Sequence, residues 1–351
     1  LEQNSDNLLV IVRGQTKEEG FIRLLAAFSL INPSDDLVKI FKRRVQVICG
    51  DLSRGQLGLS PAEWTFVSEN THTIYHNGAA VNYLFDYDAM RDSNVQGTKE
   101  IIKLSRTNGG KILNYISTTF IFGWSTKETL FESDSNEQME LLDFGYSQTK
   151  WVAERIVRNA MEEGLKARIY RPALISPSVN GEGSNFDISI RLLAFMTKYG
   201  ISTLAQNQVS FTPADIAANN IVAISNINDS LNKTFHVTRD EYANMKEVTT
   251  LLGQLNHQSF KHYKLKEFVS EVVSRCDKTD LLFPLLNFLL KSIDNISNME
   301  FKRYDNSNYV YYRDQSKWGL KDPELSEVVS GIFKFMVSKE IIEKPKTLAN
   351  V

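Results

Sequence analysis

Two side chains whose combination can do acid–base chemistry, Tyr146 and Lys150, stand four residues apart in the segment Gly145-Tyr146-Ser147-Gln148-Thr149-Lys150. If a helix begins at about Tyr146 and runs through Met161, both side chains leave the same face, one turn apart. An ammonium group near a phenol favours the phenolate, so we expect the pKa of Tyr146 to fall below its ordinary value of about 10. Such a phenol can donate a proton to a developing alkoxide, as carbonyl reduction by a hydride requires. A solvated helix face can show the same spacing, so the pair needs support from the rest of the chain.

The composition is that of an ordinary globular protein, with 351 residues, 42% of them hydrophobic, and a net charge of -2. This charge gives no electrostatic case for nucleic acid or an anionic membrane as a partner. Cys49 and Cys276 are too few for a disulfide framework and fit a reducing cytoplasm. Neither belongs to a C-x-x-C pair and the histidines show no metal-ligand spacing, so we expect no metal site. The most apolar run, residues 281–290, is too short to span a bilayer, and we expect a buried or lid helix there.

Short apolar segments rich in β-branched residues alternate with helix-patterned ones along the chain. The expected strands are residues 8–12, 45–49, 73–76, 111–117, 167–170 and 235–238. The expected helices cover residues 15–29 and 91–106 besides the one that starts at about Tyr146, and the polar residues 1–7 look like the end of a helix. This alternation predicts an α/β fold with a doubly wound parallel sheet. The unusual residues follow strand ends, where such sheets bind ligands.

Seven short motifs, taken in order, resemble those of the extended short-chain dehydrogenase/reductase family. More narrowly, they resemble the terminal thioester reductase domains of nonribosomal peptide synthetases and carboxylic acid reductases. The motifs are Val12-Arg13-Gly14, Gly50-Asp51-Leu52, residues 76–82, residues 94–98, Ser117-Thr118-Thr119, residues 146–154 and Tyr170-Arg171-Pro172. The resemblance covers residues 8–224 well and the rest loosely. It implies a Rossmann-like NADP-binding domain over residues 1–240, with residues 176–215 contributing to the substrate channel. A smaller, mostly helical substrate/lid subdomain would cover residues 241–351.

The family opens with a strand and a glycine-rich turn that holds the cofactor pyrophosphate at a helix N-terminus. No such turn precedes Leu8 in this sequence. We therefore expect that roughly 20 or more N-terminal residues, a strand with its turn and part of a helix, are missing from the printed sequence. The alternative is a protein that truly lacks them and cannot hold a dinucleotide.

The resemblance implies NADPH as the cofactor. Arg13 stands where NAD-dependent relatives carry an acid for the ribose 2′-hydroxyl, and Arg23 matches a second basic position. A guanidinium can bind a 2′-phosphate through two parallel hydrogen bonds. Further cofactor contacts are expected from Asp51, Leu52, Gly78, Ala79, Ala80, Asn94, Ser117, Lys150 and Arg171. For some of these residues a purely structural role is the alternative to cofactor binding. Arg13 and Arg23 could be ordinary surface arginines, Asp51 could be a turn residue, and Gly78 could serve tight strand–helix packing.

The expected catalytic residues are Thr118, Tyr146 and Lys150. The family places a hydroxyl residue five positions before a glycine, and Gly123 follows Thr118 at that distance. Its hydroxyl would orient the substrate carbonyl beside Tyr146, although Ser117 and Thr119 stay open as alternatives. Lys150 would lower the pKa of Tyr146 and bind the nicotinamide ribose, or else be a surface lysine paired with Glu154.

Two side chains in familiar motifs are expected to act structurally. Asn94 would hold backbone geometry. Asp215 would lie in the first turn of a helix.

By resemblance, the chain is expected to reduce an acyl or peptidyl thioester, held on the phosphopantetheine arm of a carrier protein, to an aldehyde. A second hydride transfer would give the alcohol. The chain would be a monomeric, cytoplasmic domain of a larger synthetase, with no metal, membrane or nucleic acid involved. Alternatives within the fold are a fatty acyl-CoA reductase and a nucleotide-sugar epimerase or dehydratase, although epimerases usually carry an acid at the place of Arg13. A redox-silent cyclisation or docking domain is a third reading, although such relatives typically lose the catalytic tyrosine.

Overall fold

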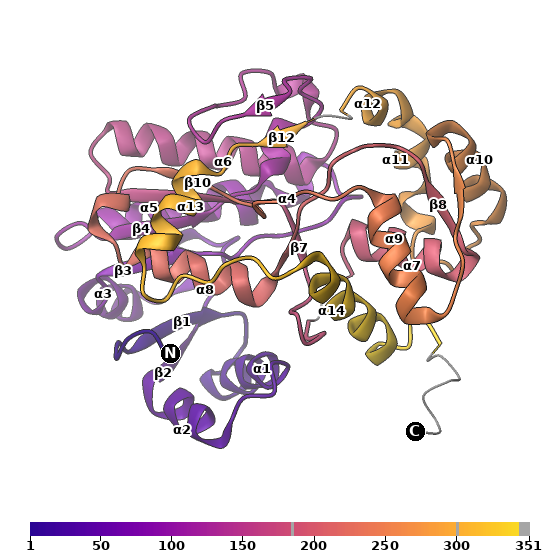
Figure 1. Ribbon diagram of the computed structural model, residues 1–351. Coiled ribbons are helices and arrows are strands. Elements are labelled where there is room, and N and C mark those ends of the chain that lie inside the picture. Colours follow the sequence, from indigo (N-terminus) through magenta and orange to yellow (C-terminus); the bar gives the residue numbers. More distant parts are fainter. Residues whose placement is uncertain (184–185, 300–301, 344–351) are drawn as a thin grey trace.

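The structure is a computed structural model that describes residues 1–183, 186–299 and 302–343 (Figure 1). Residues 184–185 of the expected channel segment, and residues 300–301 and 344–351 of the expected lid subdomain, lie outside the described residues.

A parallel sheet forms the centre of the α/β part. Four strands, β3 (Thr73–His76), β4 (Ile112–Ile116), β6 (Ala167–Pro172) and β10 (Thr234–Val237), pair in the order β10-β6-β4-β3. A separate parallel pair consists of β1 (Leu8–Val12) and β2 (Val45–Cys49). Every predicted strand is present within two residues of its expected bounds, and the predicted α/β class with a parallel sheet is confirmed.

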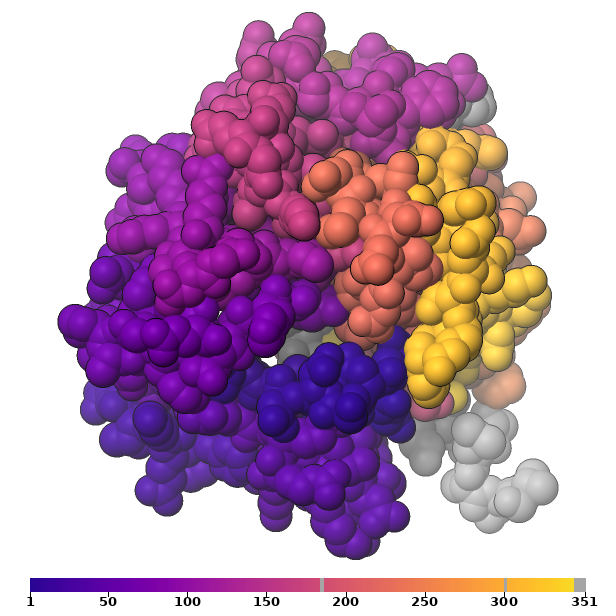
Figure 2. Space-filling model, turned by 90° about the vertical axis from the view of Figure 1, so that its left-hand side faces the viewer, coloured from indigo at the N-terminus to yellow at the C-terminus, as the bar shows by residue number. Residues whose placement is uncertain are grey.

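The sheet is divided between β1 and β3, which pair with no common strand among the described residues. Figure 2 shows an opening between the indigo N-terminal segment and the purple part of the chain. This is the place where we expected a missing strand and its glycine-rich turn, and that expectation stays a prediction.

Helices pack on the sheet through apolar faces. α6 (Gly145–Glu162) buries Ala153 and Val157, which share a core with Leu113 of β4 and Ile169 of β6. α1 (Lys17–Ser29) follows β1, and α5 (Gly97–Arg106) precedes β4. α3 (Pro61–Asn70) begins at a Ser60–Glu63 capping box with proline in its first turn, a combination that satisfies orphan backbone N–H groups.

A second hydrophobic core lies beside the sheet, on the right of Figure 1. It is formed mainly by α7 (Ile188–Tyr199), α9 (Met245–Asn256), α10 (Leu265–Arg275) and α14 (Leu325–Ser338). By contrast, α13 (Ser307–Gln315) returns to the sheet and packs Tyr309 and Tyr312 against β10 and α8 (Ala214–Ser225). The expected division at residue 240 stays a prediction. Each side of residue 240 contributes a helix to the core of the other side: α7 packs in the second core, and α13 packs on the sheet.

The remaining elements are short. Three parallel pairs join β11 (Lys261–Tyr263) to β8 (Ile201–Thr203), β12 (Arg303–Tyr304) to β5 (Thr129–Leu130), and β7 (Leu174–Ser176) to β9 (Phe211–Pro213). In the apolar run a 3-10 turn at Phe283–Leu285 leads into α11 (Leu286–Lys291), which is followed by α12 (Ile293–Ser297). Asp215 lies in the first turn of α8, as expected. Within the described part of the chain, no helix combines the length and the apolarity needed to cross a membrane.

Several sequence expectations about the helices were wrong. Residues 1–7 are not helical, and the Arg44 side chain instead binds the carbonyls of Leu1 and Asp6. The helix expected over 91–106 starts earlier, as α4 (Tyr87–Arg91), and passes through a π turn at Asp92–Gln96 before α5. α2 (Asp35–Arg44) and α3 were not predicted, and β11 and β12 interrupt the expected run of C-terminal helices.

Candidate active site

The predicted site residues gather where the parallel strands end. Arg13 follows β1, Asp51 and Leu52 follow β2, Gly78 to Ala80 follow β3, and Ser117 and Thr118 follow β4. Carboxyl ends of parallel strands share one edge of a sheet, which is where such sheets bind ligands. Tyr146 and Lys150 join them from the first two turns of α6.

The start of α6 depends on a glycine. The helix begins at Gly145 rather than at Tyr146, with Phe144 as its N-cap residue. A Cβ atom at position 145 would lie 2.2 Å from the carbonyl carbon of Asp86, so only glycine lets this segment approach the helix. The same loop brings the Tyr83 ring to 6.2 Å from that of Tyr146, a neighbour that sequence reasoning missed.

The three neighbouring hydroxyl groups after β4 have different partners. The Thr118 hydroxyl accepts from the Phe120 N–H at 3.2 Å and lies close enough to the Tyr146 phenol to act on its pKa. The Ser117 hydroxyl donates to Glu154 at 2.5 Å, and the Thr119 hydroxyl lies near the Tyr304 phenol. Thr118 is therefore the one of the three hydroxyl groups that lies near Tyr146. Its catalytic role stays a prediction.

The expected fall in the pKa of Tyr146 is wrong for this structure. Burial raises the pKa of Tyr146 to about 12, and the neighbouring Thr118 hydroxyl acts to lower this pKa without reversing the effect. The reason is that removing water disfavours the charged phenolate. The Lys150 ammonium, which was expected to favour the phenolate, donates instead to the Ile116 carbonyl oxygen at 2.7 Å.

Lys150 is not a surface lysine. Its side chain is buried, and its Nζ lies 4.4 Å from the centre of the Tyr115 ring. Burial lowers the pKa of Lys150 to about 7, although the Glu154 carboxylate acts to raise it. The alternative of an exposed Lys150–Glu154 pair is therefore wrong, since both residues are buried.

Asn94 ties the segment after β3 to the catalytic helix. Its Oδ1 accepts from the Ala80 N–H at 2.7 Å, and its Nδ2 donates to the Ala80 carbonyl and to Thr149 Oγ1, each at 2.9 Å. These bonds give Asn94 the backbone-holding role expected of it. A direct contact with cofactor stays a prediction for Asn94, Ala79 and Ala80.

Arg13 and Arg23 form an exposed basic pair beyond β1, where Arg23 Nη1 donates to the Arg13 carbonyl oxygen at 3.4 Å. Beside them, Asp51 Oδ1 accepts from the N–H and hydroxyl of Ser53 at 2.9 and 2.8 Å. The Ser53 N–H lowers the pKa of Asp51, with smaller contributions from the Ser53 hydroxyl and from Arg13.

Gly78 packs against Leu52. A Cβ atom at position 78 would lie 2.7 Å from Leu52 Cδ1, so tight packing by itself explains this glycine. The roles of Gly78 and Leu52 in binding a cofactor stay predictions.

The Arg171 side chain points into the core. It is fully buried and binds Glu154 through Nη2 at 2.6 Å and Nε at 3.1 Å. Sequence reasoning missed this network, although the Lys150-to-Glu154 spacing of four and an arginine inside an apolar strand were the available signals. The cofactor roles of Arg171 and Ser117 stay predictions, since both side chains are bound to Glu154.

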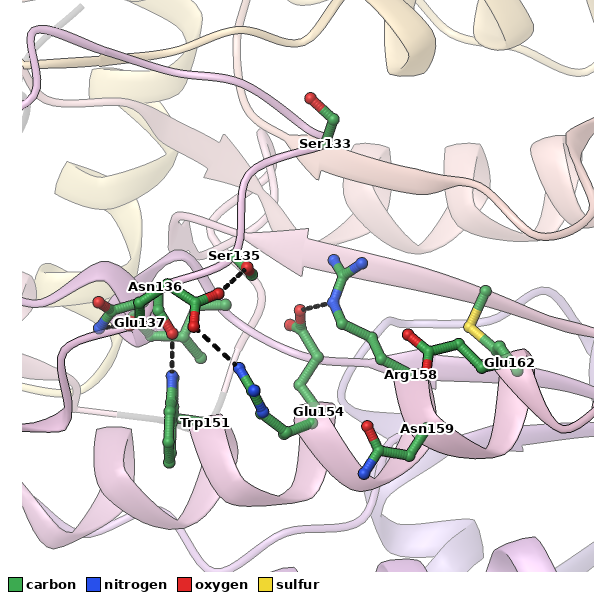
Figure 3. Close-up of a pocket in the computed structure, with 12 residues that line it drawn as sticks. Ser133, Ser135, Asn136, Glu137, Trp151, Glu154, Arg158, Asn159 and Glu162 are labelled. Carbon is green, nitrogen blue, oxygen red and sulfur yellow. Dashed lines mark hydrogen bonds and ion pairs between the residues drawn. The ribbon is translucent and has the colours of Figure 1, made fainter.

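A pocket of about 430 Å³ lies beside Glu154 (Figure 3). Its wall includes Trp151, Arg155 and Arg158 of α6, together with Ser133 and Ser135 from the loop after β5. Tyr146, Lys150 and Thr118 do not line it, so it is distinct from the predicted reaction site. In the described part of the chain, no group of three or more metal-ligating side chains is arranged to hold a metal ion.

Residues 1–221 match the NAD-binding protein family described as male sterility protein. The chain belongs to this family. It is 30% identical over 265 residues to one of the subunits of linear gramicidin synthase from Brevibacillus parabrevis, and the match covers 74% of this chain and 5% of the relative. It is 29% identical over 302 residues to L-2-aminoadipate reductase of Saccharomyces cerevisiae, covering 80% of this chain and 21% of the relative. The chain thus spans about a fifth or less of these two relatives.

Solved structures show the same architecture. The terminal R domain from the myxalamid PKS-NRPS biosynthetic pathway aligns with a TM-score of 0.87 at 26% identity, over 96% of this chain and 85% of that one. UDP-glucuronic acid 4-epimerase from Bacillus cereus, in complex with NAD, aligns with a TM-score of 0.66 at 13% identity, over 97% and 93%, which shows the fold alone. The predicted resemblance to extended short-chain dehydrogenase/reductase domains of the reductase type is confirmed. Membership of an NAD-binding family supports a nicotinamide cofactor.

The residues present fit the two ends of such a cofactor. The exposed Arg13–Arg23 pair suits the adenosine end, and Tyr146 with Lys150 suits the nicotinamide end. Gly20 lies buried in α1, and a Cβ atom there would lie 2.9 Å from Val47 Cγ1, so this glycine lets the helix pack closely on β2.

Proposed function

We propose that this chain is an NADPH-dependent thioester reductase that releases an acyl or peptidyl chain from a carrier protein as an aldehyde. The observation that carries the proposal is the grouping of the buried Tyr146 phenol, the neighbouring Thr118 hydroxyl and buried Lys150 one helical turn further along α6. The relatives support the reaction class, since three of them are named L-2-aminoadipate reductase or its large subunit, and one solved neighbour is a terminal R domain.

When bound, the cofactor supplies a hydride to the thioester carbonyl carbon. Negative charge develops on the carbonyl oxygen, which the hydroxyls of Thr118 and Tyr146 face as hydrogen-bond donors. Tyr146 then gives its proton to that oxygen. Lys150 would favour the phenolate that remains through its charge from one helical turn away, since its Nζ donates to the Ile116 carbonyl oxygen and not to the phenol. Because burial keeps the phenol protonated at neutral pH, Tyr146 starts in the state that a donor needs. Collapse of the hemithioacetal breaks its C–S bond and yields an aldehyde and the free thiol.

The preference for NADPH over NADH rests on Arg13 and Arg23. Both are exposed, Arg13 directly after β1 and Arg23 on α1, close enough for Arg23 to bind the Arg13 carbonyl oxygen. Planar guanidinium groups bind phosphate through paired hydrogen bonds, which a 2′-hydroxyl cannot match.

A carrier protein with a phosphopantetheine arm is the proposed source of the substrate. Support comes from a solved thiolation-reductase di-domain of an archaeal nonribosomal peptide synthetase, which has the same fold with a TM-score of 0.76. The near-neutral charge of the chain supports neither nucleic acid nor a membrane surface as a partner.

The test is to incubate the protein with NADPH and an acyl thioester of pantetheine or of a carrier protein. We expect one aldehyde, captured with an oxime-forming reagent, and one free thiol for each NADPH consumed in the first turnover. Release of a cyclised or hydrolysed product without consumption of NADPH would instead establish a redox-silent domain.

A further inference from the structure

Glu154 is a buried carboxylate that the proposed reaction leaves without a role. It is 2% exposed and lies one turn after Lys150 on α6. Its two oxygens accept hydrogen bonds from Ser117, Arg171 and Arg158. Figure 3 shows Glu154 in the lining of the 430 Å³ pocket, where its carboxylate forms an ion pair with Arg158.

The catalytic helix is fastened to the end of β4 by two charged side chains that bind consecutive residues. Lys150 Nζ donates to the Ile116 carbonyl oxygen at 2.7 Å, and Glu154 Oε2 accepts from the Ser117 hydroxyl at 2.5 Å. The next residue is Thr118, whose hydroxyl lies near the Tyr146 phenol. One anion and one cation thus hold the strand end that carries Thr118 against the helix that carries Tyr146.

We propose that Glu154 is a positioning residue for this site, whose carboxylate lies one helical turn from the Lys150 ammonium on α6 and whose bond to Ser117 fixes the strand end before Thr118. The consequence for reaction rate rests on the proposed function. The effect on the charge of Lys150 does not, and it can be measured without turnover.

The surroundings of Lys150 support this assignment. Burial lowers its pKa to about 7, and Glu154 is the group that acts against this fall. His76 of β3 also faces Lys150, but burial lowers the pKa of that imidazole to about 3, so it stays neutral. The other contact is the face of the Tyr115 ring, which is uncharged because burial raises the pKa of that phenol.

The surroundings of Glu154 keep it ionised. Burial would raise its pKa, but Arg171 of β6 overcomes that effect, and Arg158 and the Ser117 hydroxyl add to it, so the pKa lies at about 2. His236 of β10 also faces this cluster and is neutral, since burial and Arg171 lower its pKa to about 3. Glu154 therefore carries its charge throughout the range in which Lys150 titrates.

The experiment measures the Lys150 pKa directly. The full chain is labelled with ¹³C at lysine Cε, and the Lys150 signal is assigned by its loss in Lys150→Met. In Glu154→Gln we expect the titration midpoint of Lys150 to fall by on the order of one pH unit, because a neighbouring negative charge raises the pKa of an ammonium group by about that amount or more. If reduction is measured, the basic limb of the kcat profile should move to lower pH by the same amount, with KM for the thioester little changed.

Two further variants make the result decisive. Arg158→Gln removes a cation from the same carboxylate, but Arg158 has no contact with Lys150 or Ser117 among the described residues, so the Lys150 midpoint in this variant should match the parent.

Glu154→Gln leaves the Arg171 cation buried without its carboxylate partner, which can prevent folding. The double variant Glu154→Gln/Arg171→Gln removes both buried charges and should fold, with a midpoint that falls by less than in Glu154→Gln because a cation is lost as well. An unchanged Lys150 midpoint in either folded variant would overturn the proposal.

Discussion

Tyr146 is the residue on which the proposed chemistry depends, and its substitution gives the most specific expectation. Tyr146→Phe keeps the ring volume, so folding and cofactor binding should survive. Losing the general acid should lower the single-turnover rate by about 10²- to 10⁴-fold. Tyr311→Phe, which changes an exposed tyrosine on α13, is the matched control and should match the parent. A rate for Tyr146→Phe within a few-fold of the parent would remove Tyr146 as proton donor.

The pair Arg13 and Arg23 carries the expected cofactor preference. In Arg13→Ala/Arg23→Ala we expect weaker NADPH binding and nearly unchanged NADH binding, measured by calorimetry. Each two-point phosphate contact should contribute on the order of 1.5–3 kcal/mol. Arg43→Ala, at an exposed arginine of α2, is the control for loss of positive charge. Equal affinity of the parent for both cofactors would contradict this assignment.

Residue identity could be predicted from the sequence better than residue environment. Tyr146 and Lys150 were singled out by their spacing and Thr118 by the family resemblance, and in the structure the Thr118 hydroxyl lies near Tyr146. The direction of the Tyr146 pKa shift could not be predicted, because it depends on burial by segments distant in the sequence, including the loop that carries Tyr83. The burial of Arg171 against Glu154 likewise follows from tertiary packing alone.

The start of α6 is the element on which the geometry of the site depends most. Gly145→Ala would place a Cβ atom 2.2 Å from the Asp86 carbonyl carbon, so the helix or the loop must shift. We expect a loss of unfolding free energy of roughly 1–3 kcal/mol, the usual cost of overpacking, together with a lower kcat. Thermal and chemical denaturation measure the first and steady-state kinetics the second. Gly55→Ala, with open space around the new methyl group, should be neutral, and an equally neutral Gly145→Ala would show that the contact is not tight.

Strands were predicted more accurately than helices for a physical reason. The strands are short β-branched runs, such as Leu8 to Val12, whose pattern needs no tertiary context. α2 was missed because its sequence is mostly charged, although Ser34 caps its start. At the π turn, Asp92–Gln96, the buried apolar residues Met90 and Val95 stand five apart, so the segment departs from the 3.6-residue period on which helix prediction depends.

The division of the sheet is the main feature of the whole molecule. β1 and β2 pair only with each other among the described strands, whereas β4 and β6 lie inside a four-stranded sheet. We expect backbone amides of β1 and β2 to exchange with deuterated water much faster than those of β4 and β6, because local opening there breaks fewer packed contacts. Bound cofactor should slow the exchange of residues 8–13 most. Mass spectrometry of peptic fragments measures both, and equal protection of the two sheets would contradict this view.

The central claim is hydride transfer from a nicotinamide cofactor to a thioester carbonyl carbon. The most direct test is a single turnover with NADPH that carries deuterium at the transferred position of its nicotinamide C4, and an acyl thioester on a phosphopantetheine carrier. We predict one deuterium on the aldehyde carbon of the released product, and no labelled product from Tyr146→Phe in the same time. An aldehyde without deuterium, or release of the acyl group with the NADPH unconsumed, would contradict the account.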